Sequence, residues 1–211
     1  MQKLRLFVIR DGVVMAQKRD LTNGEQAVGF PVMETERLIL RALRNDDVDA
    51  LRDIYGDPEV IRYMADQEKP ILDADELQWV IDWSRRMYAN GSGIRWAIER
   101  KGESRLVGTC GFHLHDQHNR HAELGYDLAQ PYWRQGIMSE ALRPVLRYGF
   151  ERLKLHRIEA NVTEGNEASV RTLLKAGFRP EGAWRERAYL RGQFYDLLQF
   201  GLLREEFIPS P

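Results

Sequence analysis

A strand, a helix and a second strand follow one another between residues 121 and 162, and this order constrains the fold more than any other feature. The run "HAELGYDL" (121–128) reads as a strand, and residues 156–162 alternate as a second strand. The helical face between them consists of Leu142, Val145, Leu146, Gly149, Phe150 and Leu153. Because other strands precede this strand–helix–strand unit, the order predicts a mixed sheet with helices on its faces.

The remaining elements are placed by periodicity and by turn residues. Strands are expected at 35–43, 93–100, 104–115, 178–190 and 193–203, and helices at 45–55, 73–88 and 167–176, with a further short helix opening at 57–59. The strands at 93–100, 104–115 and 121–128 are separated only by turns, so we expect them to form a meander. The fold class is therefore α/β with one mixed sheet.

The length of the chain fits one domain with an appendage. A chain of 211 residues that is 43% hydrophobic is long enough to bury a core. We interpret residues 34–211 as the domain and residues 1–33 as a leader. Two short apolar runs around Asp11-Gly12 give this leader the signal of a hairpin. It is either an appended hairpin or an artefact of start-site choice.

Charge and cysteine content exclude several classes of function. The chain has 31 Lys and Arg against 32 Asp and Glu, so its formal charge of -1 does not favour nucleic-acid binding. The single cysteine, Cys110, allows no internal disulfide and indicates a reducing compartment. No apolar run reaches the roughly 20 residues of a membrane span, and none fits a signal peptide. The sequence therefore predicts a cytoplasmic protein without a membrane or nucleic-acid partner.

Gly136 lies between the strand at 121–128 and the helix that follows it. The free amides of a helix start, together with its partial positive charge, make a phosphate site that needs no metal. Glycine at this point permits a close approach of the backbone to a ligand. The alternative is that Gly136 only serves the turn.

The central block of the chain resembles the GNAT superfamily of N-acetyltransferases. The stretches "AELGYDLAQPYWRQGIMSEAL", "LHRIEANVTEGNEASVRTLLKAGFRPEG" and "LLREEF" are similar to the RimJ/RimL-like branch, which acetylates ribosomal-protein N-termini, and the likeness covers about residues 34–207. The resemblance implies an acyl-CoA N-acyltransferase fold, whose mostly antiparallel sheet is splayed at the cofactor site with helices on both faces. It also implies acetyl-CoA as co-substrate, an amine acceptor, and no metal.

The loop before the helix departs from the general family pattern at two positions. In the family it reads Arg or Gln, two residues, Gly, one residue, then Gly or Ala; here these positions hold Trp133, Gly136 and Met138, as is common in the ribosomal branch. The resemblance implies that backbone amides of residues 134–138 bind pyrophosphate, with Met138 narrowing the approach. Arg134 either contacts phosphate or is an exposed surface arginine. The implied cofactor-binding residues are Leu128, Trp133, Arg134, Gln135, Gly136, Ile137, Met138, Ser139, Asn166, Ser169 and Lys175.

Asn166 and Ser169 form an Asn-x-x-Ser motif with two interpretations. As local structure, Asn166 caps the helix and Ser169 is its partner in the first turn. The resemblance implies instead that Asn166 bonds the pantetheine arm and that Ser169, near the thioester sulfur, acts as an acid that assists departure of the thiolate. Lys175 either reaches a cofactor phosphate or is solvated.

Glu123 is the candidate general base, at a strand position where the family often has a carboxylate; the alternative is an ordinary edge carboxylate. With Ser169 and Asn166 it completes the predicted catalytic set. An N-terminal α-amine, with a pKa of about 7.7–8.0, is partly neutral at pH 7, whereas lysine at about 10.4 is protonated, so a modest base suffices only for the former. We therefore expect a protein N-terminus, of the ribosomal-protein type, as acceptor. A small-molecule amine (antibiotic, polyamine or amino acid), a CoA-binding sensor without transfer, and any oligomeric state stay open.

The histidines at 113, 115, 118 and 121 are an alternative metal site. No acidic or cysteine ligand completes a known spacing, so no metal is expected. We expect these histidines to border the acceptor cleft, together with Trp79, Trp83 and Trp96. Acceptor choice is expected to depend on the helices at residues 45–90.

Overall fold

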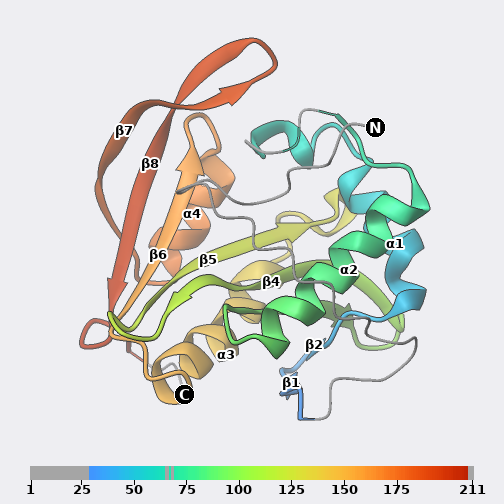
Figure 1. Cartoon of the computed structure of the whole chain (residues 1–211), viewed down its shortest axis with the longest axis horizontal. Helices are drawn as coiled ribbons and strands as arrows, with labels where there is room; N and C mark the ends of the chain where they lie inside the picture. The colour runs from blue at the N-terminus through green and yellow to red at the C-terminus, as the bar shows by residue number, and fades with distance from the viewer. Residues whose placement is uncertain (1–28, 65–66, 68, 209–211) are drawn as a thin grey trace.

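The computed structural model describes residues 29–64, 67 and 69–208, and its centre is one eight-stranded sheet (Figure 1). Its strands are β1 (Met33–Glu34), β2 (Leu38–Arg41), β3 (Ile94–Arg100), β4 (Arg105–Asp116), β5 (His121–Leu128), β6 (Arg157–Thr163), β7 (Arg179–Leu190) and β8 (Gln193–Leu203). They lie in the order β1-β2-β3-β4-β5-β6-β8-β7. The predicted meander is confirmed, because β3, β4 and β5 are antiparallel neighbours.

The sheet opens between β5 and β6, which form the one parallel pair among the described strands. Their pairing runs only from His121 opposite Arg157 to Glu123 opposite Glu159. Beyond this point β5 continues to Leu128 beside β4, and β6 continues to Thr163 beside β8. The predicted mixed sheet, splayed on one side, is therefore confirmed.

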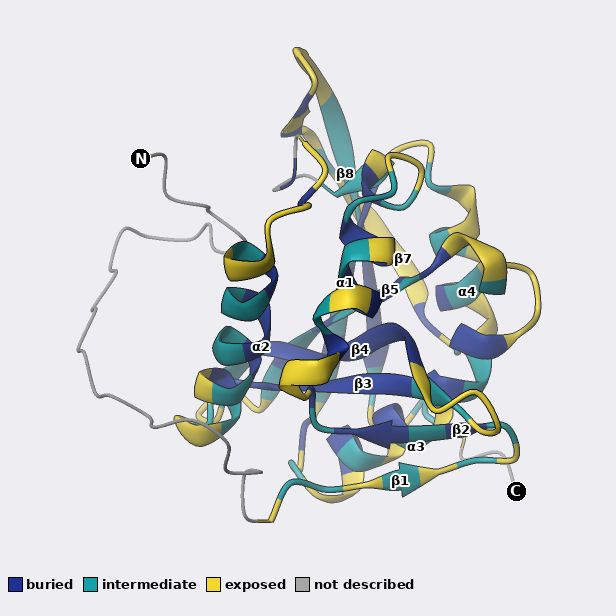
Figure 2. Ribbon diagram, turned by 90° about the vertical axis from the view of Figure 1, so that its right-hand side faces the viewer, coloured by how far each residue is buried: buried dark blue, intermediate teal, exposed yellow. Residues whose placement is uncertain are grey.

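In the described part of the chain, four α-helices cover the two faces of the sheet: α1 (Val48–Tyr55), α2 (Ala74–Ala89), α3 (Ile137–Glu151) and α4 (Glu167–Lys175). The apolar sides of α1 and α2 form one buried cluster with residues such as Ala97 and Leu106. The apolar side of α3 and Leu173 of α4 belong to a second, larger cluster that includes the inner side of β2–β6. Figure 2 shows the buried residues on the sides of the helices that face the sheet.

Local sequence signals fix where the helices begin. The side chain of Asp73 caps α2 by accepting hydrogen bonds from the backbone N–H groups of Asp75 and Glu76, at 2.9 and 3.1 Å. The short helix η1 (Asn45–Asp47) leads into α1, and the two together occupy the segment 45–55 where a helix is predicted. The short helix expected to open at residues 57–59 is a single turn: Asp57 accepts from the N–H of Glu59 at 2.8 Å through its side chain and from the N–H of Ile61 at 3.1 Å through its carbonyl, and the segment leads into η2 (Ile61–Tyr63), a 3₁₀ helix. A single turn followed by three residues of 3₁₀ helix is too short to build an α-helical face.

The N-terminal end of the described chain packs on the domain. Phe30 packs against the larger core cluster, and the backbone carbonyl of Pro31 accepts a hydrogen bond from the Trp96 indole at 2.8 Å. Trp96 is fully buried, so the expectation that it borders an open cleft is wrong: a strand with both faces covered buries its tryptophan. The hairpin predicted around Asp11-Gly12 lies outside the described residues. Within those residues, no helix is long and apolar enough to cross a membrane.

Candidate active site

The segment that joins β5 to α3 exposes a row of backbone amides. After β5 it passes through η3 (Gln130–Tyr132), and Arg134 and Gly136 both have left-handed backbones, with φ of 61° and 75°. Glu140 is the first residue of α3 whose N–H bonds back into the turn, to the carbonyl of Gly136 at 3.0 Å. No acceptor among the described residues binds the backbone N–H groups of residues 134–139. These groups and the positive end of α3 form a site suited to an anion.

Side chains of the same segment hold it in shape. The indole of Trp133 donates to the carbonyl oxygen of Leu128 at 2.7 Å, and the Gln135 amide donates to the carbonyl of Pro131 at 2.7 Å. The side chains of Ile137 and Met138 are buried in the core below α3, so these two residues contribute only their backbone N–H groups to the amide row.

Two polar side chains of the segment stay near the surface. The side chain of Arg134 is exposed and pairs with no carboxylate of the described chain, while Ser139 is half-buried. Of the residues predicted to bind the cofactor through this segment, Arg134 is thus placed to add a charged side chain.

Arg37, which sequence reasoning did not identify, contacts this segment from the turn before β2. Its guanidinium donates to the Gln135 carbonyl at 3.0 Å and to the Glu140 carboxylate at 2.6 Å. No local signal could have found it, because Glu140 is 103 residues further along the chain.

The Asn-x-x-Ser motif lies at the start of α4, beside the opening between β5 and β6. Asn166 is the cap of α4, and its side-chain oxygen accepts from the backbone N–H of Ser169 at 3.1 Å. The interpretation of Asn166 as the cap of the helix is therefore confirmed. Because the cap uses the side-chain oxygen, the amide nitrogen of Asn166 is available as a donor. Lys175 is exposed at the opposite end of α4, about 9 Å along the helix from Ser169 at 1.5 Å per residue.

A tyrosine of β5 contacts the serine of this motif. The hydroxyls of Tyr126 and Ser169 lie 2.8 Å apart, across the opening of the sheet. Burial raises the pKa of Tyr126 to about 12, although the Ser169 hydrogen bond opposes this shift. Tyr126 is therefore a neutral phenol near pH 7, able to donate its proton in a hydrogen bond. The alternation of β5 places it on the core side, and the sequence gives no further sign of its contact.

Glu123 lies on the other face of β5, opposite His113 of β4. Its carboxylate oxygen is 3.4 Å from the His113 imidazole Nε2, and its side chain is 24% exposed. Burial raises the pKa of Glu123, but hydrogen bonds from His113 and Asn161 and the charge of His113 outweigh burial and hold the pKa below its usual value. Glu123 is thus a carboxylate at neutral pH and a weak base.

A buried charged cluster holds the end of β5 on the face that carries Glu123. Asp127 pairs with the guanidinium of Arg95 at 2.5 Å and accepts hydrogen bonds from the hydroxyls of Thr109 at 2.8 Å and Tyr55 at 3.0 Å. Both charged side chains are at least 95% buried. Because a paired and hydrogen-bonded buried carboxylate is costly to disturb, this cluster fixes the strand from which the amide segment begins. The alternation of residues 121–128 predicted a strand here, but it could not predict that Asp127 would meet Arg95, Thr109 and Tyr55.

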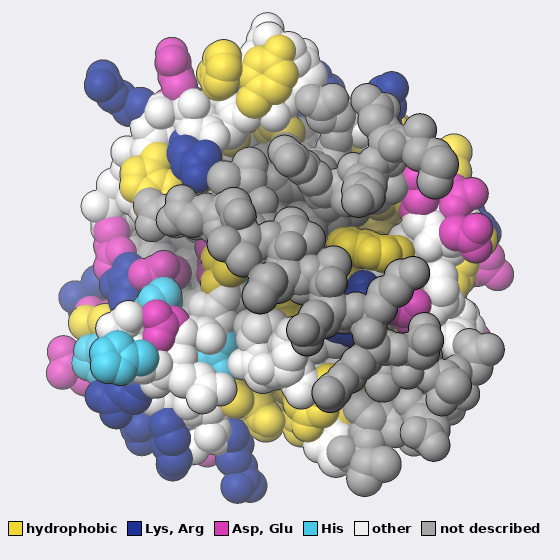
Figure 3. Space-filling view, in the orientation of Figure 1, with side chains coloured by type: hydrophobic (Ala, Val, Ile, Leu, Met, Phe, Trp, Pro, Cys, Tyr) yellow, Lys and Arg dark blue, Asp and Glu magenta, His cyan; other side chains and the backbone are white. Residues whose placement is uncertain are grey.

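The remaining histidines lie near the turn between β4 and β5, where Figure 3 shows imidazoles beside acidic side chains. His121 is 3.8 Å from Asp116, while His113 faces Glu123. Within the part of the chain that the structure describes, no group of three or more His, Cys, Asp or Glu side chains is placed to hold a metal ion.

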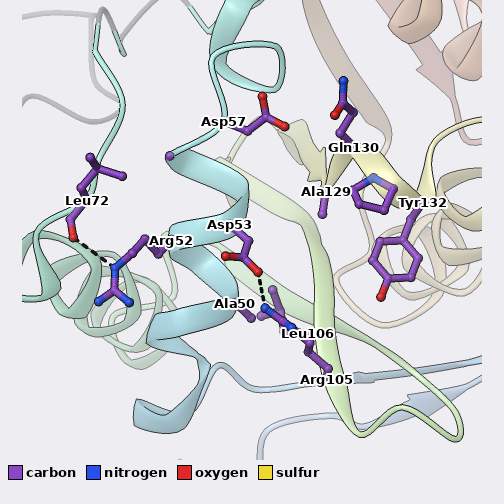
Figure 4. Close-up of a pocket in the computed structure, with 12 residues that line it drawn as sticks. Ala50, Arg52, Asp53, Asp57, Leu72, Arg105, Leu106, Ala129, Gln130 and Tyr132 are labelled. Atoms are coloured by element: carbon purple, nitrogen blue, oxygen red, sulfur yellow. Dashed lines mark hydrogen bonds and ion pairs between the residues drawn. The ribbon is translucent and has the colours of Figure 1, made fainter.

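A pocket of about 520 Å³ opens between α1, the start of β4 and η3 (Figure 4). Figure 4 shows Arg105 directed toward Asp53, with which it forms an ion pair, and Arg52 directed toward the carbonyl of Leu72. None of the residues predicted for catalysis or cofactor binding lines this pocket.

A family model for the acetyltransferase (GNAT) domain matches residues 37–179, which include the amide segment and the Asn-x-x-Ser motif. The chain belongs to the GNAT acetyltransferase family. It is an acetyl-CoA-dependent N-acetyltransferase. The RimJ/RimL-like resemblance of the sequence is confirmed, because a ribosomal-protein-alanine N-acetyltransferase is among its relatives.

Two relatives of this chain are N-acetyltransferases that differ in how closely they match it. An uncharacterized N-acetyltransferase of Bacillus subtilis, YoaA, is 39% identical over 175 residues, which is 83% of this chain and 98% of that protein. The ribosomal protein uS5-alanine N-acetyltransferase of Escherichia coli is 26% identical over 185 residues, covering 84% of this chain and 93% of its own.

Solved GNAT structures share the fold. A probable acetyltransferase superposes with a TM-score of 0.76 at 31% identity, over 83% of this chain and 98% of its own. Two solved complexes with CoA share the fold of this chain at a lower sequence identity, so they support the fold and not the substrate. They are RimL, a ribosomal L7/L12 α-N-protein acetyltransferase (TM-score 0.73, 20% identity, 82% and 98% covered), and a Vibrio cholerae spermidine N-acetyltransferase with spermine (0.71, 23%, 82% and 98%).

Proposed function

We propose that this N-acetyltransferase acts on the α-amine of a protein N-terminus and binds the pyrophosphate of acetyl-CoA at the amide segment before α3. The observation that carries the choice of acceptor is the environment of Glu123: its carboxylate lies 3.4 Å from the His113 imidazole, and although burial raises its pKa, hydrogen bonds from His113 and Asn161 hold that pKa below its usual value. So weak a base suffices for an amine that is already partly neutral near pH 7, and not for an alkylammonium with a pKa near 10. The uS5-alanine N-acetyltransferase among the relatives supports the same class of acceptor.

The residues of the amide segment fit a pyrophosphate. The backbone N–H groups of residues 134–139 have no acceptor within the described chain, and Gly136 leaves the approach to them open. The exposed guanidinium of Arg134 adds a charge-assisted donor at the same edge. We propose that Leu128 and Trp133 contribute by shaping the segment, since their mutual hydrogen bond folds it back on β5.

Acetyl-CoA supplies an acetyl thioester, so the new C–N bond forms at its carbonyl as the C–S bond breaks. In this proposal Glu123 takes the proton lost by the amine, directly or through a water molecule. Ser169 donates its hydroxyl proton toward the departing sulfur. The Tyr126 hydroxyl lies 2.8 Å from the Ser169 hydroxyl, in a contact where either oxygen can donate, and in this proposal Tyr126 is the donor, which leaves the serine proton free for the sulfur. Asn166 offers its amide nitrogen to the pantetheine arm, and Lys175 offers a cation at the far end of α4.

Thiol release in the presence of acetyl-CoA tests the choice of acceptor. The panel contains a peptide with a free N-terminus, the same peptide with an acetylated N-terminus and one internal lysine, and spermidine. We expect release with the free N-terminus only, at a rate that rises with pH up to about 8 as the amine loses its proton. Release with spermidine alone would support the small-molecule alternative, and CoA binding without release on any amine would support a sensor.

A further inference from the structure

Arg37 lies at a turn that is itself fixed on the sheet. The backbone N–H of Leu38 donates to the Thr35 hydroxyl at 3.0 Å, and the N–H of Thr35 donates to the Leu38 carbonyl at 3.0 Å. The carbonyl of Arg37 in turn accepts a hydrogen bond from the backbone of Lys101 at 2.9 Å. The backbone of Arg37 is thus held at two points, and its side chain extends toward the first turn of α3.

Glu140 receives this side chain with several hydrogen bonds. Its carboxylate accepts from the Thr35 hydroxyl at 2.6 Å, the Arg37 backbone N–H at 2.9 Å and the Arg37 Nε at 2.6 Å. Burial raises the pKa of Glu140, but the Thr35 and Arg37 hydrogen bonds and the charge of Arg37 outweigh burial and lower it. Near pH 7 the two side chains therefore form an ion pair, at 2.6 Å, beside the amide segment.

The remaining arm of the guanidinium reaches the backbone of that segment. Arg37 Nη1 donates to the carbonyl oxygen of Gln135 at 3.0 Å, and Nη2 lies 3.6 Å from the position that a Cβ on Gly136 would take. In a trans peptide the carbonyl oxygen and the following N–H point in opposite directions. Holding the Gln135 oxygen against Arg37 therefore directs the N–H of Gly136 away from Arg37, and within the described chain no acceptor binds that N–H.

We propose that Arg37 is a positioning residue for phosphate binding. It holds the Gln135–Gly136 peptide in the orientation that presents the Gly136 N–H to the pyrophosphate, and it neutralises Glu140, whose charge would otherwise repel that anion. The inference rests on the proposed function of the amide segment. It adds a residue from the start of the domain to a site otherwise built from residues 128–139 and 166–175.

The test compares Arg37→Gln with the wild type by titration with CoA, followed both by calorimetry and by the ¹H–¹⁵N signal of Gly136. We expect the Kd for CoA to rise about tenfold, equivalent to about 1.4 kcal/mol, and the shift of the Gly136 signal at saturation to shrink. Lys101→Gln is the matched control, because Lys101 bonds Glu34 and the Thr35 carbonyl but does not touch the amide segment. Its Kd is expected to stay within about twofold.

Arg37→Lys keeps the charge but loses the fork that reaches both partners, so an intermediate Kd is expected. Unchanged CoA affinity in Arg37→Gln would overturn the proposal, as would a lost affinity with an unchanged Gly136 shift. Unfolding of both Arg37 variants would also overturn it, because Arg37 would then serve the fold as a whole. A wild type that binds no CoA would instead refute the proposed function of the segment itself.

Discussion

Replacing Gly136 by Asn and by Asp separates the conformation of the amide segment from its charge. Gly136 has φ 75° and ψ 5°, a left-handed backbone that Asn and Asp adopt more readily than other residues. A Cβ there would meet only Arg37 Nη2, at 3.6 Å, which is an ordinary contact. The two variants therefore share one shape and one backbone cost, and they differ by a single negative charge.

The charge is expected to act in opposite directions on folding and on binding. At the start of α3 an Asp carboxylate interacts favourably with the helix dipole, by about 0.3–1 kcal/mol, so Gly136→Asp should be at least as stable as Gly136→Asn. Against a bound pyrophosphate the same carboxylate is repelled. At about 4 Å one pair of unit charges costs about 1 kcal/mol in water and about 4 kcal/mol near a protein surface. Because Gly136 is exposed, the lower value applies, and two phosphate charges give about 2 kcal/mol, or roughly 30-fold in Kd.

Calorimetric titration with CoA at about 50 mM and about 1 M NaCl measures this difference. We expect the ratio of the two Kd values to fall severalfold at high salt, because the screening length shortens to about 3 Å. Thermal unfolding of both variants provides the control for folding. Equal CoA affinities of the Asn and Asp variants at low salt would refute the assignment of an anion to this segment.

Three further predictions concern the sheet beside the opening. Because the lowered pKa keeps Glu123 ionised throughout pH 6–9, Glu123→Gln should reduce kcat/KM by about 10²-fold or more over that whole range, and a variant that changes only the limbs of the pH profile would contradict a base at this position. Tyr126→Phe should slow acetyl transfer about fivefold in the wild type and have no effect in the Ser169→Ala background; an equal loss in both backgrounds would exclude action through the serine. Asp127→Asn leaves Arg95 buried without its charge partner, so the free energy of unfolding should fall by about 3–5 kcal/mol, seen as a drop of about 10 °C in Tm, and a Tm within about 2 °C of wild type would contradict this account.

The fold could be predicted from the sequence where a local signal and the core agreed. Apolar residues at helical spacing predicted α2 and α3, and turn residues separated the strands of the meander. The segment after α1 forms only one turn and η2 because Asp57-Pro58-Glu59 carries a helix-start signal without an apolar face behind it. Local chemistry can begin a turn there, but only packing continues it into a helix.

The site was predictable only as far as its parts are local in the chain. The amide segment and the Asn166 cap depend on neighbours within a few residues, and both were identified from their motifs. Arg37 and the Tyr126 contact with Ser169 depend on residues 103 and 43 positions apart, which no periodicity reports. Sequence patterns place side chains on a face of a strand or helix, and the packing of separate elements decides which of them meet.

The alternation of β5 explains how one strand serves both sides of the proposed reaction. Ala122, Leu124 and Tyr126 face the cluster under α3 and α4, where Tyr126 meets Ser169. Glu123 and Asp127 are on the opposite face, where Asp127 accepts a hydrogen bond from Tyr55 of α1. A proton acceptor and the partner of a proton donor are thus three residues apart and on opposite faces of the sheet, and the opening beyond Glu123 is where the two faces communicate. Because a slip of one residue would exchange the faces, the register of β5 against β4 has to be fixed. The buried pair of Asp127 with Arg95 of β3, together with the hydrogen bonds of Asp127 to Thr109, fixes it at the end of the strand where β6 no longer pairs.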